Sequence, residues 1–222
     1  MLIQQKSPEW FNIRKGRITS SEVWKIMGEG KSKTESLSET AKSYLLEKVS
    51  EKLGGFSSPA LGQALDWGTD LEDTARDIYK AATGLDVQPC SFYTVGNHYG
   101  GSPDSIVNPD GTLEIKCPYN SVNHFKYGLI TSDAEFKKAS TAYYYQCISH
   151  MAVTGAKWCD FISFDPRVST DYMMFIYRLH RDEDEIKNML SRVDIAVGYM
   201  KELANKLPKS IISEEQIVIK EE

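Results

Sequence analysis

The chain has 222 residues and a hydrophobic fraction of 41%, which is enough to bury the core of one domain. It contains no apolar run long enough to cross a membrane, and its amino terminus lacks the apolar core of a signal peptide, so we expect no membrane association and a cytoplasmic location. The net charge of −5 does not by itself favour binding to nucleic acid.

The charges are unevenly distributed along the chain. Residues 1–34 carry seven Lys or Arg against three acids, whereas residues 182–222 carry ten acids against six bases. One interpretation is a phosphate-binding face near the amino terminus with an acidic far side. The other is an ordinary solvated surface, and composition alone is compatible with both.

The four cysteines are widely spaced and lie in apolar segments, at positions 90, 117, 147 and 159. No Cys-x-x-Cys pair is present, which argues against a zinc site or an iron–sulfur cluster. We therefore expect buried free thiols in a reducing compartment.

The amino-terminal part is predicted to be helical. Ser7-Pro8-Glu9 is typical of a helix start, with Ser as the cap and Pro in the first turn, and Gly16 would end that helix. The segment Thr19–Glu22 matches a capping box and predicts a short helix that ends at Gly28. Residues 28–38 form a polar loop.

Two longer helices are expected next. A helix of about 14 residues carries Ala41, Leu45, Val49 and Leu53 at helical spacing. A second helix covers about 61–83 and is closed by Gly84.

The remainder alternates between strands and helices. Strands are predicted over about 86–95, 102–107, 112–117, 158–164 and 172–180, and helices over 140–154 and about 183–207, with an irregular segment at 119–138. This order predicts an α/β (α+β) domain with a central mixed sheet flanked by helices. We expect one domain over residues 1–222, with a polar carboxy-terminal tail at about 208–222.

The most informative pattern is Ser102-Pro103-Asp104 followed by Glu114-Ile115-Lys116. The two segments flank a turn sequence at 108–111, so a hairpin would bring Asp104 and Glu114 together across two strands. Glu114 and Lys116 are two residues apart and leave the same face of a strand. Two carboxylates and an amine at one point are typical of a magnesium-dependent nuclease. The alternative is a hairpin with solvated charges.

Three further polar groups stand out. Glu72 falls on the apolar stripe of the 61–83 helix, where a carboxylate is either a metal ligand, paired with an Arg or at the edge of the core. Gln146 lies beside the apolar stripe of the 140–154 helix and His150 lies on it, and we expect His150 to be a hydrogen-bonded core histidine. Arg14 and Ser21 could grip a phosphate, since Ser21 would lie in the first turn of a helix, although Arg14 alone would more often form a surface ion pair.

In five ordered segments the chain resembles the lambda-type phage exonucleases, or viral recombinase nucleases, which have a restriction-endonuclease-like fold. The segments are Trp10–Val23, Ala64–Gly68 with Glu72, Ser102–Asp104, Leu113–Pro118 and Ala142–Gln146. One departure is His150, which stands where related nucleases often have Tyr four residues after the Gln.

The resemblance implies roles for individual residues. Asp104 and Glu114 would bind two Mg²⁺ ions, for which Mn²⁺ could substitute, together with the Ile115 carbonyl. Glu72 would support the second ion. Lys116 would orient or activate the attacking water, and Gln146 would hold that water or the nearby site in place. Arg14, Ser21 and Ser102 would bind the DNA 5′-phosphate.

The resemblance also implies digestion of one strand of linear duplex DNA from 5′ to 3′, which leaves 3′ single-stranded overhangs. It further implies a homotrimer, a single-strand annealing protein as partner, and a phage or prophage origin in a bacterial host. The alternatives are a site-specific or structure-specific endonuclease on the same core, a non-catalytic DNA-binding or assembly protein, and a structural protein with chance motifs.

Overall fold

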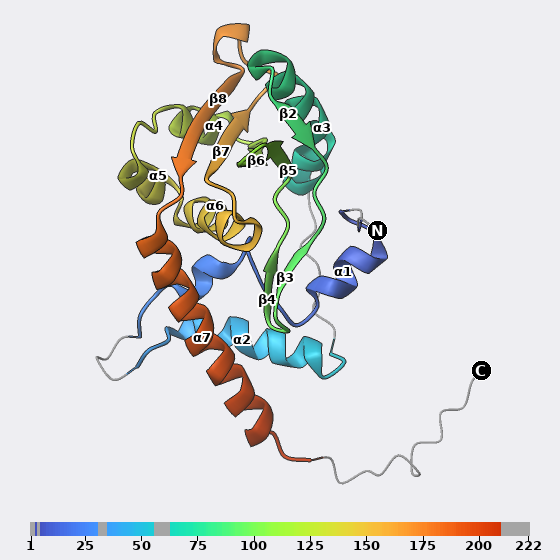
Figure 1. Ribbon diagram of the computed structural model, residues 1–222, viewed down its shortest axis with the longest axis vertical. Coiled ribbons are helices and arrows are strands. Elements are labelled where there is room, and N and C mark those ends of the chain that lie inside the picture. Colours follow the sequence, from blue (N-terminus) through green and yellow to red (C-terminus); the bar gives the residue numbers. More distant parts are fainter. Residues whose placement is uncertain (1–2, 4, 31–34, 56–62, 210–222) are drawn as a thin grey trace, which may run out of the picture.

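Helices enclose two sheets in the part of the chain that the structure, a computed structural model, describes: residues 3, 5–30, 35–55 and 63–209 (Figure 1). The α-helices are α1 (Pro8–Arg14), α2 (Glu39–Lys52), α3 (Gln63–Thr83), α4 (Ser121–Gly128), α5 (Asp133–Ala139), α6 (Thr141–Thr154) and α7 (Glu183–Lys206). Residues 31–34 of the expected polar loop and residues 210–222 of the expected tail lie outside the described residues.

The larger sheet is mixed and has the strand order β2-β5-β6-β7-β8. Only β6 and β7 are parallel among its neighbouring pairs, and the other pairs are antiparallel. The strands are β2 (Asp86–Gln88), β5 (Ser105–Asn108), β6 (Gly111–Lys116), β7 (Trp158–Phe164) and β8 (Met174–His180). The predicted fold class, a mixed sheet flanked by helices, is confirmed.

Side chains along β6 alternate between two helical layers. Leu113 and Ile115 pack with Ala75 and Tyr79 of α3. Glu114 leaves the other face of the strand, where α6 covers the sheet. Because both faces are covered, β6 and β7 are almost entirely buried, as expected for central strands.

A smaller sheet, with the order β1-β4-β3, was not expected from the sequence. It contains β1 (Ile18–Thr19), β3 (Tyr93–Val95) and β4 (Tyr99–Gly101). The prediction of one strand over 86–95 is wrong: β2 and β3 belong to different sheets, and Pro89, which cannot donate to a ladder, lies between them. The predicted capping box is also wrong, because Thr19 is paired with β4 and the following 3₁₀ turn has no side-chain cap.

Most other elements follow local signals. The Ser7 hydroxyl accepts from the Trp10 N–H at the start of α1, and Gly84 takes a φ of 68° after α3, as predicted. The segment 119–138, expected to be irregular, instead contains α4 and α5. Their caps are Asn120 and Ser132, whose side chains accept from backbone N–H groups in the first turn.

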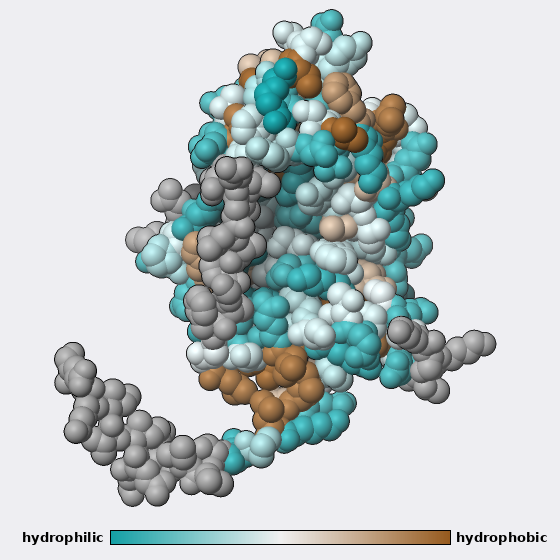
Figure 2. All heavy atoms as spheres, turned by 180° about the vertical axis from the view of Figure 1, so that it is seen from behind, coloured by the Kyte–Doolittle hydropathy of each residue, from teal (hydrophilic) through white to brown (hydrophobic). Residues whose placement is uncertain are grey.

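The surface mixes hydrophilic and apolar side chains. Figure 2 shows hydrophilic side chains over most of one face, with apolar ones in separate groups toward its two ends. Within the described residues, no helix has both the length and the apolar character needed to span a membrane.

Gly101 lies where β4, α6 and the segment after β1 meet. A Cβ atom at this position would be 1.8 Å from the Ser20 hydroxyl oxygen and 3.5 Å from Cδ2 of His150. The backbone of β4 can approach Ser20 this closely only because residue 101 has no side chain.

Gly101→Ala should lower the free energy of unfolding by about 1–3 kcal/mol, because the added methyl group forces Ser20 or the backbone to move. Gly198→Ala, on α7, is the matched control, since an added Cβ there has no other atom within 4 Å. That control should be neutral or stabilising by up to about 1 kcal/mol. Urea unfolding of both variants measures the difference, and equal stability of Gly101→Ala and the wild type would contradict the packing.

Candidate active site

The β5–β6 hairpin places two acids side by side. Ser105 is paired with Leu113, so Asp104 and Glu114 are the next residues across the pair. The Asp104 N–H donates to the Leu113 carbonyl at 3.1 Å, and Oδ2 of Asp104 accepts from the Ile115 N–H at 2.7 Å. The predicted proximity of the two acids is confirmed, and backbone hydrogen bonds fix Asp104 against β6.

Glu114 and Lys116 share the face of β6 that is directed toward α6. Glu114 is fully buried, and the Lys116 ammonium forms an ion pair with its carboxylate. Lys116 Nζ also lies 4.9 Å from the ring centroid of Tyr143. An amine, two carboxylates and an aromatic ring therefore meet at one point.

Burial and mutual repulsion shift the titration of these groups. Burial, followed by the charge of Asp104, raises the pKa of Glu114 to about 8, and burial likewise raises the pKa of Asp104 to about 6. Burial alone would lower the pKa of Lys116, but the charges of Glu114 and Asp104 outweigh it and raise that pKa. Lys116 is therefore an ammonium ion at any working pH.

The donor set fits a hard cation. Both carboxylate oxygens of Glu114 are buried without a hydrogen bond, and only Oδ2 of Asp104 is engaged by the backbone. Mg²⁺ commonly uses one or two carboxylates and completes its shell with waters and substrate phosphates. Within the described residues, no group of three or more His, Cys, Asp or Glu is arranged to hold a metal ion, so Glu72 does not join Asp104 and Glu114 in one ligand set in this structure.

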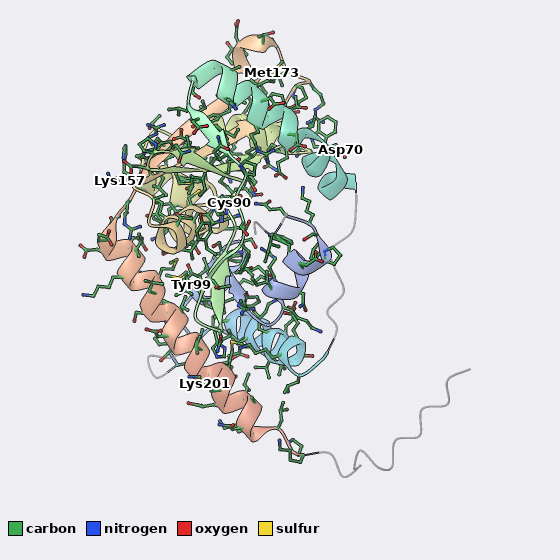
Figure 3. All side chains as sticks on the ribbon, turned by 45° about the vertical axis from the view of Figure 1, so that its right-hand side comes forward. Asp70, Cys90, Tyr99, Lys157, Met173 and Lys201 are labelled. Atoms are coloured by element: carbon green, nitrogen blue, oxygen red, sulfur yellow. The ribbon has the colours of Figure 1, made fainter. Side chains whose placement is uncertain are left out.

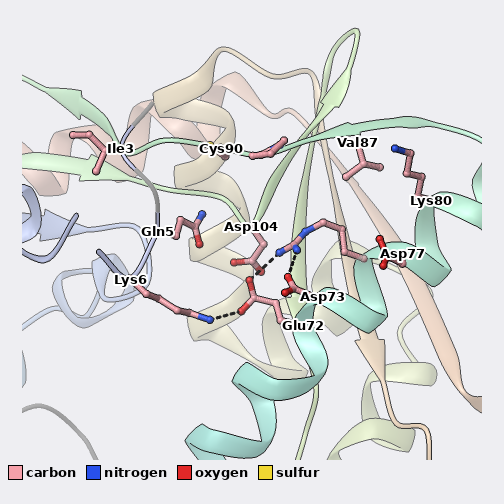
Figure 4. Close-up of a pocket in the computed structure, with 12 residues that line it drawn as sticks. Ile3, Gln5, Lys6, Glu72, Asp73, Asp77, Lys80, Val87, Cys90 and Asp104 are labelled. Carbon is pink, nitrogen blue, oxygen red and sulfur yellow. Dashed lines mark hydrogen bonds and ion pairs between the residues drawn. The ribbon is translucent and has the colours of Figure 1, made fainter. Parts of the chain in front are cut away.

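Glu72, on α3, contacts cations rather than the other acids. Its oxygens pair with Lys6 Nζ at 3.1 Å and with Arg76 Nη2 at 3.0 Å (Figure 4). The pairing with an Arg, one of the alternatives from the sequence, is thus present. Glu72 and Asp104 nevertheless line the same two neighbouring cavities, of about 520 and 490 Å³, and Lys6 lines both as well.

Two residues of the amino-terminal segment reach the site and had no signal in the sequence. Besides the contact of Lys6 with Glu72, Gln5 Nε2 donates to the Ser102 hydroxyl and to the Pro103 carbonyl, both at 2.7 Å. Lys6 has a φ of 66°, which is uncommon for a residue with a side chain. These polar residues precede the first helix, where no periodicity could connect them to the acids.

Gln146 and His150 approach from α6, one helical turn apart. Both are buried, and His150 Nδ1 lies 3.3 Å from Oε2 of Glu114 without the geometry of a hydrogen bond. Burial, then the charges of Lys116 and Arg14, lowers the pKa of His150 to about 3. The expected burial of His150 in the core is confirmed, but its Nδ1 has no hydrogen-bond partner, contrary to the expectation. The four-residue spacing between Gln146 and His150 was the signal in the sequence that both side chains lie on one face of this helix.

Arg14 and Ser21 are brought together as the sequence predicted. Arg14 Nη2 donates to the Ser21 hydroxyl at 3.3 Å, and its guanidinium lies 4.0 Å from the Trp10 ring centroid. Ser21 precedes a 3₁₀ turn and does not occupy the first turn of a helix, so that part of the prediction is wrong. The Ser102 hydroxyl contacts Gln5 instead of this pair.

Comparisons with known proteins agree on one kind of relative. Residues 9–157 match the YqaJ-like viral recombinase domain. The crystal structure of an alkaline exonuclease from Laribacter hongkongensis is similar with a TM-score of 0.76 and 29% identity, over 90% of this chain and 95% of that one. The same enzyme in complex with dAMP gives a TM-score of 0.77 at 29% identity and the same coverage.

A phage-related exonuclease from Haemophilus somnus shares the fold, with a TM-score of 0.73 and 20% identity over 86% of this chain and 96% of that one. No curated protein matches the chain significantly. Together with the mixed sheet, these structures establish the exonuclease fold with its restriction-endonuclease-like core.

The raised pKa of Glu114 predicts a pH-dependent stability of the metal-free protein. Its pKa is about 8 in the folded chain against 4.5 as the ordinary value, so the folded state binds more protons between these limits. The contribution of Glu114 to the free energy of unfolding is therefore fully present below about pH 4.5 and is lost as the pH rises through 8. Between pH 5 and pH 8.5, the free energy of unfolding of Glu114→Gln should fall by about 2–4 kcal/mol less than that of the wild type, because the amide does not ionise.

Denaturant unfolding in EDTA at the two pH values measures this difference. Asp70→Asn removes an exposed carboxylate from α3 and is the matched control. It should follow the wild type. An identical pH dependence for Glu114→Gln and the wild type would contradict the raised pKa.

Proposed function

The chain belongs to the YqaJ-like viral recombinase family and is a DNA exonuclease, and we propose that it digests linear duplex DNA with Mg²⁺, from 5′ to 3′, leaving 3′ single-stranded overhangs for recombination. The observation that carries the proposal is that Asp104 and Lys116 line one cavity, while Glu114 is buried beside them and forms an ion pair with Lys116. Acids held together at raised pKa values are ready to exchange protons for a divalent ion.

Asp104 and Glu114 would hold the metal, with the Ile115 carbonyl as a further oxygen ligand. Glu72 would join them at a second ion if Lys6 and Arg76 release it. Divalent magnesium, when bound, supplies a water of lowered pKa and positive charge for the leaving oxygen. Mn²⁺ would serve in place of Mg²⁺ because it also prefers oxygen ligands.

Lys116 acts as a fixed positive charge in this proposal. Its raised pKa keeps it protonated, so it donates hydrogen bonds to the attacking water or to the phosphate and does not remove a proton. A charge that is already in place stabilises the negative charge gained in the transition state without reorganisation. Gln146 would position the same water from α6.

Arg14 and Ser21 would bind the 5′-phosphate of the DNA end. Burial lowers the pKa of Arg14, and this cost is offset when an anion approaches the guanidinium. A phosphate fits the fork of an arginine in a bidentate manner. Ser102 would complete the pocket if its hydroxyl exchanges Gln5 for the phosphate.

The resemblance to lambda-type exonucleases supports three further proposals. The enzyme would work as a homotrimer around duplex DNA, with a single-strand annealing protein as its partner. Its substrate would be DNA in the cytoplasm of a bacterial host. A ring of subunits would hold the enzyme on DNA mechanically, so the net charge of −5 would not prevent long runs of digestion.

A linear duplex labelled at either terminus, incubated with Mg²⁺, tests the activity and its direction. We expect early release of the 5′ label, persistence of the 3′ label, and no cutting of a covalently closed circle. Lys116→Ala should abolish cleavage and preserve DNA binding, because it removes the charge and leaves the two acids. Cutting of the circle would indicate an endonuclease, and normal turnover of Lys116→Ala would refute the role of this lysine.

The 5′-phosphate pocket generates its own prediction. Arg14→Ala should slow digestion of 5′-phosphorylated ends by at least about tenfold, since a charge-assisted hydrogen bond contributes roughly 1.5–3 kcal/mol. It should slow hydroxyl ends much less. Initial rates on the two substrates measure the ratio, with Lys15→Ala as a control for loss of positive charge nearby. Equal slowing on both ends would exclude a phosphate pocket at Arg14.

A further inference from the structure

Four cationic or titratable side chains lie together at the turn between β3 and β4, away from Asp104 and Glu114. We call them the basic cluster: Arg17, Lys52, His98 and Lys201. Arg17 follows α1, Lys52 ends α2, His98 lies in the β3–β4 turn and Lys201 lies in the last third of α7. Figure 3 labels Lys201. Segments far apart in the sequence therefore contribute positive charge to one place.

The basic cluster is held in a defined geometry. Lys52 Nζ contacts Nδ1 of His98 at 2.5 Å and donates to the Asn97 carbonyl at 3.2 Å. The carbonyl of His98 accepts from the Ile18 N–H at 2.8 Å, which fixes the turn beside Arg17. The side chain of Lys52 lies directly over Gly16, where an added Cβ would be 2.3 Å from its Cγ.

The positive charge of the basic cluster is not neutralised by acids. In the described parts of the chain, no carboxylate forms an ion pair with Arg17, Lys52 or Lys201, and Nε of Arg17 is buried without a hydrogen-bond partner. Burial, then the neighbouring cations, lowers the pKa values of both Lys52 and His98. Cations that repel one another in a protein of net charge −5 form a site for an anion.

The position of the basic cluster indicates which anion this is. Strand β4 leads from His98 toward Asp104, six residues further on, which corresponds to at most about 20 Å along an extended chain. One strand of B-DNA carries a phosphate about every 3.4 Å along the axis, so this separation spans at most roughly six nucleotides. A backbone that enters the carboxylate site can therefore reach the basic cluster.

We propose that the basic cluster binds backbone phosphates of the DNA within about six nucleotides of the position of the cut. This inference rests on the proposed nuclease function, and it adds a second contact to the substrate, remote from the reacting phosphate. The contact is independent of base sequence, because phosphates carry no sequence information. It supplies affinity and holds the register of the strand.

The salt dependence of DNA binding tests the proposal, with a 20-base-pair duplex in EDTA so that no hydrolysis occurs. Each lost phosphate contact reduces the slope of log Kd against log salt by about 0.9, equivalent to about eightfold weaker binding at 0.1 M salt. Lys201→Gln should show one such loss, and Lys52→Gln with Lys201→Gln should show about two. Lys187→Gln, an exposed lysine on the same helix, should retain the wild-type slope.

Lys201 is exposed on α7, so its single variant keeps the test valid if the double variant is unstable. Repeating the titrations with a single strand of equal length shows whether the phosphates belong to the duplex ahead of the cut or to the strand left behind. A reduced slope on either one supports the proposal. Slopes equal to that of Lys187→Gln on both would overturn it, and an acidic protein would then be the ligand to seek. Because the assay contains no divalent ion, failure of the nuclease activity leaves binding measurable and the two failures distinguishable.

Discussion

The burial of Glu114 between β6 and α6 is the constraint on which the rest of the site depends. A carboxylate with no exposed atom is stable only where cations are close, and here Lys116 extends from the same face of the same strand. The register of the hairpin then determines where Asp104 lies. A slip of one residue would turn Leu113 toward α6 and Glu114 into the apolar contact with α3, so the core and the site are specified by the same pairing.

The smaller sheet connects the acids Asp104 and Glu114 to Arg14 of the amino-terminal segment. Strand β4 pairs with β1, and Gly101 lets the backbone approach Ser20 and the ring of His150 at once. His150 in turn lies against Glu114 and within the electrostatic influence of Arg14. The acids and Arg14 belong to segments far apart in the sequence, and the packing around one glycine brings them together.

The sequence predicted those parts of the fold and site that local chemistry determines. The hairpin follows from its turn residues, and α6, β7 and α7 follow from the pattern of their apolar residues. The strands β1 and β4 are too short for a periodic signal, and the contact of Lys6 with Glu72 joins residues 66 positions apart. The missing hydrogen-bond partner of His150 Nδ1 also depends on tertiary packing. Helical spacing predicts that a histidine faces the core, but it does not predict which groups surround the ring.

Some cations of this protein are paired with acids within the fold, and others have no acid partner among the described residues and are available to a ligand. Lys48 is buried but paired with Glu51, and Arg178 is paired with Asp160, so both charges are satisfied within the fold. Lys116 is likewise compensated by Glu114, which an incoming divalent ion would share. The basic cluster has no such acid among the described residues: Lys52 donates to the Asn97 carbonyl and Arg17 to the Ile13 carbonyl, and neither is paired with a carboxylate. A net charge of −5 is therefore compatible with DNA binding, because electrostatic attraction depends on where the unpaired cations lie and not on the sum over the chain.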